Sequence, residues 1–415
     1  MFDQRAVNRN ATLMILEGTL FWAGLSFLQG DTVITNFIRL TAGSAALAGF
    51  AATIKTLMWL AGQFVLGLFF HRFRSQSRLM AVVGFTCRPI VLLMALMMFS
   101  GVTGMAAAWG FLGLYALFFL LDGFLTLCWA EIANRTLPIA RRGVVISMQQ
   151  TFAGIAGLGV GGALRAVLGS ELSFQMQYAV IFALGGTLML LDAVVLSMIR
   201  DVPHPSQPDQ PPVHPLKYIR RLLPILRDNA PVRHTLVARL LYTVTLMAAP
   251  INLMFGRDAG LSEAQLATLV FMPVLGQIVA GVMWAQVCRR FSYPVMMRMG
   301  EALGILCALT NILCWMFARW GVPVMVPLSV AMVLVSLNTS AYTGFYQHMI
   351  TLVAPEIRSD AIVLNALVLT PLSFSTYFAG LIVEHAGYLP VYLIMLVSGT
   401  VGWFLVRRLV PVTPK

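Results

Sequence analysis

Long apolar runs fill most of this chain, and they limit its fold more than any other feature. Twelve such runs can be marked between charged residues or proline and glycine breaks. A helix that crosses a bilayer needs about 20 mostly apolar residues. The sequence therefore predicts an all-α integral membrane protein with twelve membrane-spanning helices. The expected spans are 12–38, 43–70, 79–99, 106–130, 143–168, 177–199, 234–255, 263–288, 294–318, 324–353, 360–384 and 390–409.

Composition and missing motifs exclude several classes of protein. The chain is 59% hydrophobic and only 11% charged, whereas soluble domains carry about 25% charged residues. This balance excludes a cytosolic enzyme, a disordered scaffold and a nucleic-acid-binding protein. The sequence has no phosphate-binding loop, no zinc-protease motif and no Cys-x-x-Cys pair. We therefore expect no enzymatic activity, no cofactor and no bound metal.

The distribution of basic residues predicts the orientation in the membrane. Of the 28 lysines and arginines, twenty-one lie at the termini or in the even-numbered connections. Four lie on the opposite side, and three lie inside apolar runs. Positive residues collect on the cytoplasmic side of membrane proteins. We therefore expect a multi-pass protein of the inner (plasma) membrane with both termini in the cytoplasm.

One long polar segment divides the spans into two groups of six. The sequence predicts an N-terminal six-helix bundle at 1–199, a cytoplasmic linker at 200–233 and a C-terminal six-helix bundle at 234–415. The linker begins with a proline-rich stretch. Its second part, residues 216–227, alternates leucines with four basic residues. That pattern fits a basic amphipathic helix on the inner membrane surface, or alternatively a solvated connector.

The two halves contain similar short motifs at similar places. Residues 62–67 and 276–281 both read Gly-Gln-x-Val-x-Gly, at an offset of 214 positions. Residues 138–142 and 355–358 both begin with proline and end in arginine, at an offset of 217. These correspondences indicate an internal duplication. Duplicated six-helix halves are an architecture of secondary transporters.

The loop after the second expected span resembles a motif of the major facilitator superfamily, Gly-x-Leu-Ala-Asp-Arg-x-Gly-Arg-Arg. Gly67 and Arg72 match it, while His71 replaces its aspartate. The turn Pro138-x-x-Arg141-Arg142-Gly143 resembles a branch of the superfamily whose substrate is not defined. The resemblance implies two pseudo-symmetric six-helix bundles. It also implies conformational roles for six loop-motif residues: Gly67, Arg72, Arg141, Arg142, Gly281 and Arg358.

A glycine cluster in the fifth expected span bears on the direction of transport. Gly157, Gly161 and Gly162 fit the superfamily's antiporter motif Gly-Pro-x-x-Gly-Gly, except that Leu158 replaces the proline. Small residues allow helices to approach closely. The motif favours export of an amphipathic compound, and import of a metabolite stays open as the alternative. Close helix packing without a transport role would explain the same glycines.

Four ionisable residues inside the apolar runs are candidates for the transport mechanism. They are Asp31, Lys55, Arg88 and Asp122. Charged groups inside a bilayer are costly and usually face a cavity or a partner. Asp31 or Asp122 could exchange a proton as access alternates, and Lys55 could pair with Asp31 or hold an anionic substrate group. Alternatively, Arg88 and Asp122 form a static buried pair.

The tenth expected span is unusually polar. In the superfamily that the chain resembles, the tenth helix lines the central cavity. Polar and aromatic groups in a cavity suit an amphipathic organic substrate, although they can also bond between helices. The candidate cavity residues here are Asn338, Thr339, Tyr342 and Tyr346.

Together these features predict a secondary active transporter. We expect it to move a small organic molecule by alternating access, coupled to protons, with membrane lipids as its surroundings and a monomer as its working form. Two other classes compete with this prediction. A transporter-like sensor would signal through residues 216–227, and a membrane-embedded enzyme would need converging catalytic groups that the sequence does not show.

Overall fold

The computed structural model describes residues 4–28, 33–42, 45–201 and 213–409. Within these ranges the chain is built from helices, with no strand. Nine helical stretches in the described part are long and apolar enough to cross a membrane. They correspond to the expected spans other than the first, second and seventh. The prediction of an all-α membrane fold is confirmed.

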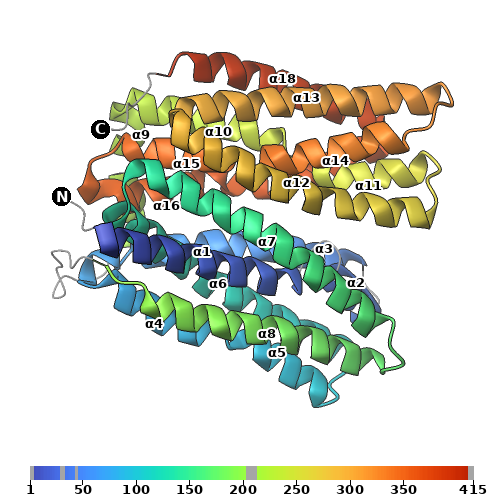
Figure 1. Cartoon of the computed structure of the whole chain (residues 1–415), viewed down its shortest axis with the longest axis horizontal. Coiled ribbons are helices and arrows are strands. Elements are labelled where there is room, and N and C mark those ends of the chain that lie inside the picture. Colours follow the sequence, from blue (N-terminus) through green and yellow to red (C-terminus); the bar gives the residue numbers. More distant parts are fainter. Residues whose placement is uncertain (1–3, 29–32, 43–44, 202–212, 410–415) are drawn as a thin grey trace. The chain divides into compact units, whose positions relative to one another are not determined.

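The helices follow one another with short connections (Figure 1). Up to residue 198 they are α1 (Gln4–Ser26), α2 (Thr35–Ala42), α3 (Ala45–Gly67), α4 (Gln76–Cys87), α5 (Ile90–Phe99), α6 (Gly104–Thr136), α7 (Ile139–Leu168) and α8 (Phe174–Met198). Beyond the linker they are α9 (Pro215–Asp228), α10 (Ala230–Val244), α11 (Ala248–Asp258), α12 (Glu263–Arg290), α13 (Tyr293–Arg319), α14 (Met325–Thr339), α15 (Tyr342–Thr351), α16 (Arg358–Leu369), α17 (Ser375–Ala386) and α18 (Tyr388–Arg407).

Several expected spans consist of two helices rather than one. The third span divides into α4 and α5 at Arg88 and Pro89, where the proline cannot donate a helical hydrogen bond. The tenth divides into α14 and α15 at Ser340 and Ala341. Breaks of this kind leave backbone carbonyls for side chains to satisfy. At the tenth-span break, Trp284 donates to the Leu337 carbonyl at 2.9 Å.

The described helices form two compact units, which do not follow the chain order strictly. The first comprises residues 1–138, 155–220 and 358–370. The second comprises 139–154, 221–357 and 371–415. The start of α7 thus belongs with the second unit, and α16 belongs with the first. The bundle boundaries at 199 and 234 stay predictions from the sequence.

Glycines allow close helix packing in the first unit. A Cβ atom at Gly62 in α3 would overlap the carbonyl oxygen of Leu120 in α6, and Gly123 is in the same contact from the other side. Near the other end of the unit, the buried ring of Phe37 lies 4.9 Å from Phe111 and 5.1 Å from Tyr178. These contacts join α2, α3, α6 and α8 around one apolar core.

The second unit repeats the glycine contact. A Cβ at Gly276 in α12 would lie 2.7 Å from the Cβ of Ser336 and 2.9 Å from the carbonyl oxygen of Val333, both in α14. Gly62 and Gly276 are the first residues of the repeated motif. They therefore make equivalent contacts in the two units, as a duplication predicts. Figure 1 also shows α13 and α18 side by side within this unit.

Side chains from distant parts of the chain cap two helices of the first unit. The carboxylate of Asp201 accepts hydrogen bonds from the backbone N–H groups of Gln76 at 2.6 Å and Ser77 at 3.0 Å, at the start of α4. At the end of α8, Nη2 of Arg9 donates to the Met198 carbonyl at 2.9 Å. Each cap satisfies backbone groups that a helix end leaves unpaired.

Candidate functional site

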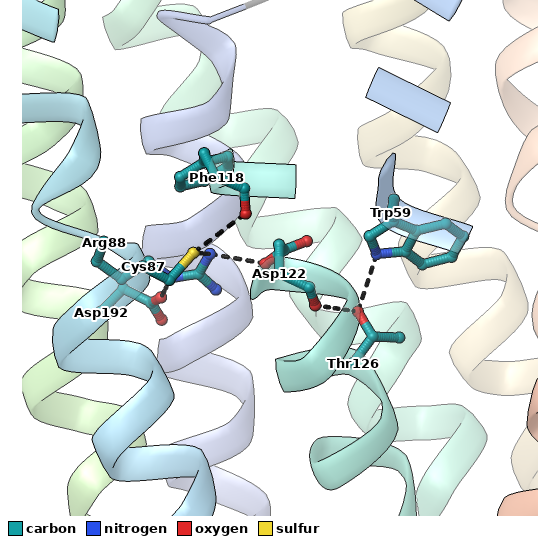
Figure 2. Close-up of polar contacts among 7 residues, drawn as sticks. All are labelled: Trp59, Cys87, Arg88, Phe118, Asp122, Thr126 and Asp192. Atoms are coloured by element: carbon teal, nitrogen blue, oxygen red, sulfur yellow. Dashed lines mark hydrogen bonds and ion pairs between the residues drawn. The ribbon is translucent and has the colours of Figure 1, made fainter. Parts of the chain in front are cut away.

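A buried charge cluster lies in the interior of the first unit, around Arg88 (Figure 2). Its Nη1 atom is 2.7 Å from Oδ1 of Asp122 in α6, and its Nε atom is 2.6 Å from Oδ2 of Asp192 in α8. The side chains of the three residues are between 0% and 6% exposed. Arg88 lies at the break between α4 and α5, where its side chain reaches both α6 and α8. The arginine therefore compensates two carboxylates at once.

Glu17 brings a third carboxyl group to this cluster. It is buried in α1 and accepts a hydrogen bond from Nε1 of Trp129 at 2.9 Å. It also interacts electrostatically with Asp192, Arg88 and Asp122. If all four groups were ionised, the cluster would carry two more negative than positive charges. Such an excess is very costly away from water.

Aromatic rings and backbone hydrogen bonds hold the cluster in place. The guanidinium carbon of Arg88 lies 4.5 Å from the ring centre of Phe21 and 5.6 Å from that of Phe118. Trp59 of α3 donates to Thr126 at 3.0 Å, and the Thr126 hydroxyl donates to the carbonyl of Asp122 at 2.9 Å. Figure 2 shows this chain of contacts beside the arginine. Helices α1, α3, α6 and α8 are thus coupled to one polar centre.

Of the other predicted charges, the structure describes Lys55. The ammonium of Lys55, half-buried in α3, lies 5.5 Å from the ring centre of Phe119. Asp31 lies outside the described residues, so the suggested pairing of Lys55 with Asp31 stays a prediction. Arg88 does pair with Asp122, and also with Asp192; that this pair is static stays a prediction.

The four candidate residues of the tenth span differ in burial: one is buried in hydrogen bonds between helices, and three are at least partly exposed. Asn338 is buried, and its amide donates to the Thr245 hydroxyl at 3.0 Å. The Tyr242 hydroxyl donates to the carbonyls of Asn338 and Thr339, the latter at 3.1 Å. Tyr242 thereby satisfies two backbone carbonyls at the helix break. Thr339 is exposed, and Tyr342 and Tyr346 are half-buried.

Gly67 of the first loop motif lies against a tyrosine of the linker helix α9. A Cβ at Gly67 would lie 2.6 Å from the Tyr218 hydroxyl. This hydroxyl donates to Oδ1 of Asp360, in the first turn of α16, at 3.0 Å. Arg72 is exposed at the end of a short 3₁₀ turn, Phe70–Arg72, and half-buried Arg358 begins α16. Gly67 therefore allows close approach of the linker.

The second loop motif brings α12 against the start of α7. A Cβ at Gly281 would overlap the hydroxyl of Thr151 and lie 2.6 Å from the carbonyl oxygen of Ser147. Arg141 is exposed, whereas Arg142 is buried and interacts electrostatically with Tyr293. Conformational roles for these residues stay predictions.

The sequence analysis did not single out Asp192 or Glu301, and it assigned no role to Glu17 or to Arg239, one of the three basic residues inside apolar runs. Asp192 stands alone in an apolar run of α8, and Glu301 stands likewise in α13. Isolation of an ionisable residue within an expected span is the signal that singled out Arg88 and Asp122. Applied to every span, that signal finds all four.

Comparison with known proteins identifies the fold. No family model matches the chain, and no curated protein matches it. Among solved structures, the proton:xylose symporter XylE of the major facilitator superfamily superposes with a TM-score of 0.71 and 13% identity, over 100% of this chain and 98% of that one. The fucose:proton symporter FucP of E. coli gives a TM-score of 0.70 and 12% identity, over 96% and 97% of the two chains.

A third similar structure has a different kind of cargo. The human organic anion transporter MFSD10 gives a TM-score of 0.68 and 13% identity, over 96% of this chain and 99% of that one. At these identities the comparison shows a shared fold. The chain therefore has the fold of major facilitator superfamily transporters along nearly its whole length.

Proposed function

We propose that this protein is a secondary active transporter that couples the movement of a small organic molecule to protons by alternating access. The observation that carries the proposal is the cluster of three buried carboxyl groups around Arg88. Its excess of negative charge is relieved when a carboxyl group binds a proton. The fold supports the proposal, because similar structures include two proton symporters.

Glu17 and Asp192 are the proposed proton carriers. Both are buried, they interact electrostatically, and Oδ1 of Asp192 has no hydrogen-bond partner among the described residues. They lie on α1 and α8, two helices that pack against each other. A rearrangement of these helices that admits water would release the proton, and renewed burial would bind it again. Protonation and conformation are thereby coupled.

Transport measurements in vesicles can separate proton coupling from substrate binding, because exchange of labelled substrate needs binding but no net proton movement. The purified protein would be placed in vesicles that contain a pH-sensitive dye, and sugars, amines and organic acids would be added in turn. A transported compound should move protons in the wild type and in the control Asp201→Asn, which keeps the cap on α4. In Asp192→Asn, gradient-driven transport should be lost while exchange of labelled substrate continues. Transport without proton movement in the wild type would contradict the proposal.

Export is the proposed direction, with uptake of a metabolite as the alternative. The argument is the glycine pattern of α7. Cβ atoms at Gly157 and Gly162 would meet no heavy atom of the described residues within 4 Å, so other helices do not pack tightly on these two glycines. Comparison of inside-out with right-side-out vesicles measures the direction.

We propose that the protein works as a monomer. We also propose that the linker helix α9 lies on the inner surface of the membrane. Leu216, Ile219 and Leu223 are exposed on one side of the helix. Basic residues lie beside this apolar stripe, as in helices that rest on anionic lipid. Four of them are exposed: Lys217, Arg220, Arg221 and Arg227. Removal of residues 216–227 would abolish output but keep ligand binding if the protein were instead a sensor.

A further inference from the structure

Arg239 of α10 lies in an aromatic cage in the second unit. Its guanidinium carbon is 5.4 Å from the ring centres of Tyr242 and Tyr342 and 5.8 Å from that of Phe345. The arginine is half-buried. The rings supply cation–π attraction and fix the position of the guanidinium, but they do not satisfy its N–H donors.

Two nitrogen atoms of the guanidinium have no hydrogen-bond partner in the described part of the chain. The Nε and Nη1 atoms of Arg239 are buried and have no hydrogen-bond partner among the residues that the structure describes. None of the ion pairs in that part of the chain includes Arg239. Arg88, by contrast, binds a carboxylate with each of two nitrogens. A shielded guanidinium with unused donors favours an anion that can accept hydrogen bonds from it.

Glu301 interacts electrostatically with Arg239 but does not fill this role. Its side chain is fully buried in α13, and neither carboxyl oxygen has a hydrogen-bond partner in the described part of the chain. It packs against Gly402 of α18. No ion pair joins Glu301 to Arg239 in the described part of the chain, so Glu301 does not occupy the free donors of the arginine.

Accessible polar groups lie next to the cage on the tenth span. Tyr342 and Tyr346 are one turn apart in α15 and share a face. Both are half-buried, and Thr339 at the end of α14 is exposed, whereas Gln347 is buried. The side chain of Gln150 interacts with the Tyr342 hydroxyl. A ligand at this face would meet hydroxyl groups and aromatic rings beside the arginine.

We propose that Arg239 binds the carboxylate of an organic anion whose apolar or aromatic body contacts Tyr342 and Tyr346. The planar guanidinium forms two parallel hydrogen bonds to a carboxylate, and the tyrosine rings provide apolar contact area. This inference rests on the proposed function in one respect, that the bound anion is the cargo. It names the class of that cargo, which the proton cluster does not.

Thermal unfolding of the full-length protein in detergent tests the site. The probes are acetate, benzoate and 2-naphthoate, each compared with its amide, which has nearly the same shape without the charge. Benzoate and naphthoate should raise the unfolding temperature in a saturable manner, and the amides should not. Arg239→Gln should weaken carboxylate binding roughly tenfold or more, as loss of a charged hydrogen bond does.

Two comparisons guard against misreading. Arg319→Gln is the matched control, because Arg319 is exposed and also lies over an aromatic ring, that of Trp315 at 5.2 Å; this variant should bind as the wild type does. The comparison of each acid with its amide uses only the wild type, so it stands even if Arg239→Gln fails to fold.

Each outcome either supports the anion site or overturns it. Absence of saturable stabilisation by every carboxylate, or equal stabilisation by acids and amides, would overturn the anion site. Unchanged binding in Arg239→Gln would overturn it as well. These results are independent of proton flux. Proton-coupled transport of a neutral compound that does not need Arg239 would overturn the anion site alone, whereas carboxylate binding followed by transport without protons would overturn the proposed coupling alone.

Discussion

Nε of Arg88 lies 2.6 Å from Oδ2 of Asp192, although the two residues stand 104 positions apart in the chain. The contact joins the break between α4 and α5 to the last third of α8. Because Asp122 takes the Nη1 atom of the same arginine, loss of the arginine leaves two carboxylates without a cation. The stability of the first unit should therefore depend on Arg88 more than on either aspartate.

Replacement of Arg88 by methionine should destabilise the protein by about 3–5 kcal/mol near pH 8, the cost of a buried charge that has lost its partner. The loss should shrink as the pH is lowered, because a carboxyl group that has bound a proton needs no cation. Thermal unfolding in detergent at several pH values measures this. A destabilisation that stays constant over the whole range would contradict the account of the cluster.

The triple variant Arg88→Met, Asp122→Asn, Asp192→Asn removes both ion pairs of the cluster together and leaves Glu17 in place. It should recover much of the stability lost in Arg88→Met, since replacement of a whole buried ion network is often close to neutral. Unfolding measurements on the single and triple variants decide the matter. If the triple variant is as unstable as the single one, the ion pairs are not the cause of the loss.

Gly62→Ala should destabilise the first unit by about 1–3 kcal/mol, because the added methyl group overlaps the Leu120 carbonyl and the two helices must separate. Gly157→Ala is the control, as its Cβ would have no described heavy atom within 4 Å. Equal behaviour of the two alanine variants in thermal unfolding would refute the close packing of α3 and α6.

Tyr242→Phe should cost about 1–3 kcal/mol, because the carbonyls of Asn338 and Thr339 lose the hydroxyl that donates to them. The variant keeps the aromatic ring beside Arg239, so carboxylate binding should change little. Unfolding temperature and benzoate titration, measured on the same sample, separate the two effects. A stable variant that no longer binds benzoate would reverse the roles assigned to this tyrosine.

Asp201→Ala should destabilise α4 by about 1 kcal/mol through loss of its N-terminal cap, and Asp201→Asn should retain most of that stability. Unfolding curves of the two variants test this directly. A larger loss for asparagine than for alanine would show that Asp201 acts through its charge elsewhere.

The sequence alone predicted the membrane fold, because apolar runs and the asymmetry of basic residues are properties of the chain that need no tertiary information. It also singled out Arg88 and Asp122 as a possible buried pair. It could not show that Asp192 and Glu17 join them, because that depends on how α1 and α8 pack. The division of the tenth span at Ser340 was equally hidden, since the carbonyls freed there are satisfied by Tyr242 and Trp284 from distant helices.

The assignment of α7 and α16 to the two units shows a second limit of prediction from the sequence. Counting spans placed all of α7 in the first half and α16 in the second. The contacts of Gly281 with Thr151 and of Tyr218 with Asp360 instead place the start of α7 with α12, and α16 with α3. Hydropathy contains no information on such pairings. The glycines that permit them, Gly67 and Gly281, were found only as repeated motif residues.

The most direct test of the central claim is substrate movement against its own gradient, driven only by a pH difference. Vesicles with the membrane potential held at zero would receive a one-unit pH step, with a transported compound at equal concentration on both sides. Because one pH unit corresponds to about 1.4 kcal/mol, one proton per substrate should support up to roughly tenfold accumulation. Glu17→Gln and Asp192→Asn should show none. A compound that the wild type equilibrates but never accumulates, whatever the pH step, would contradict proton-coupled transport.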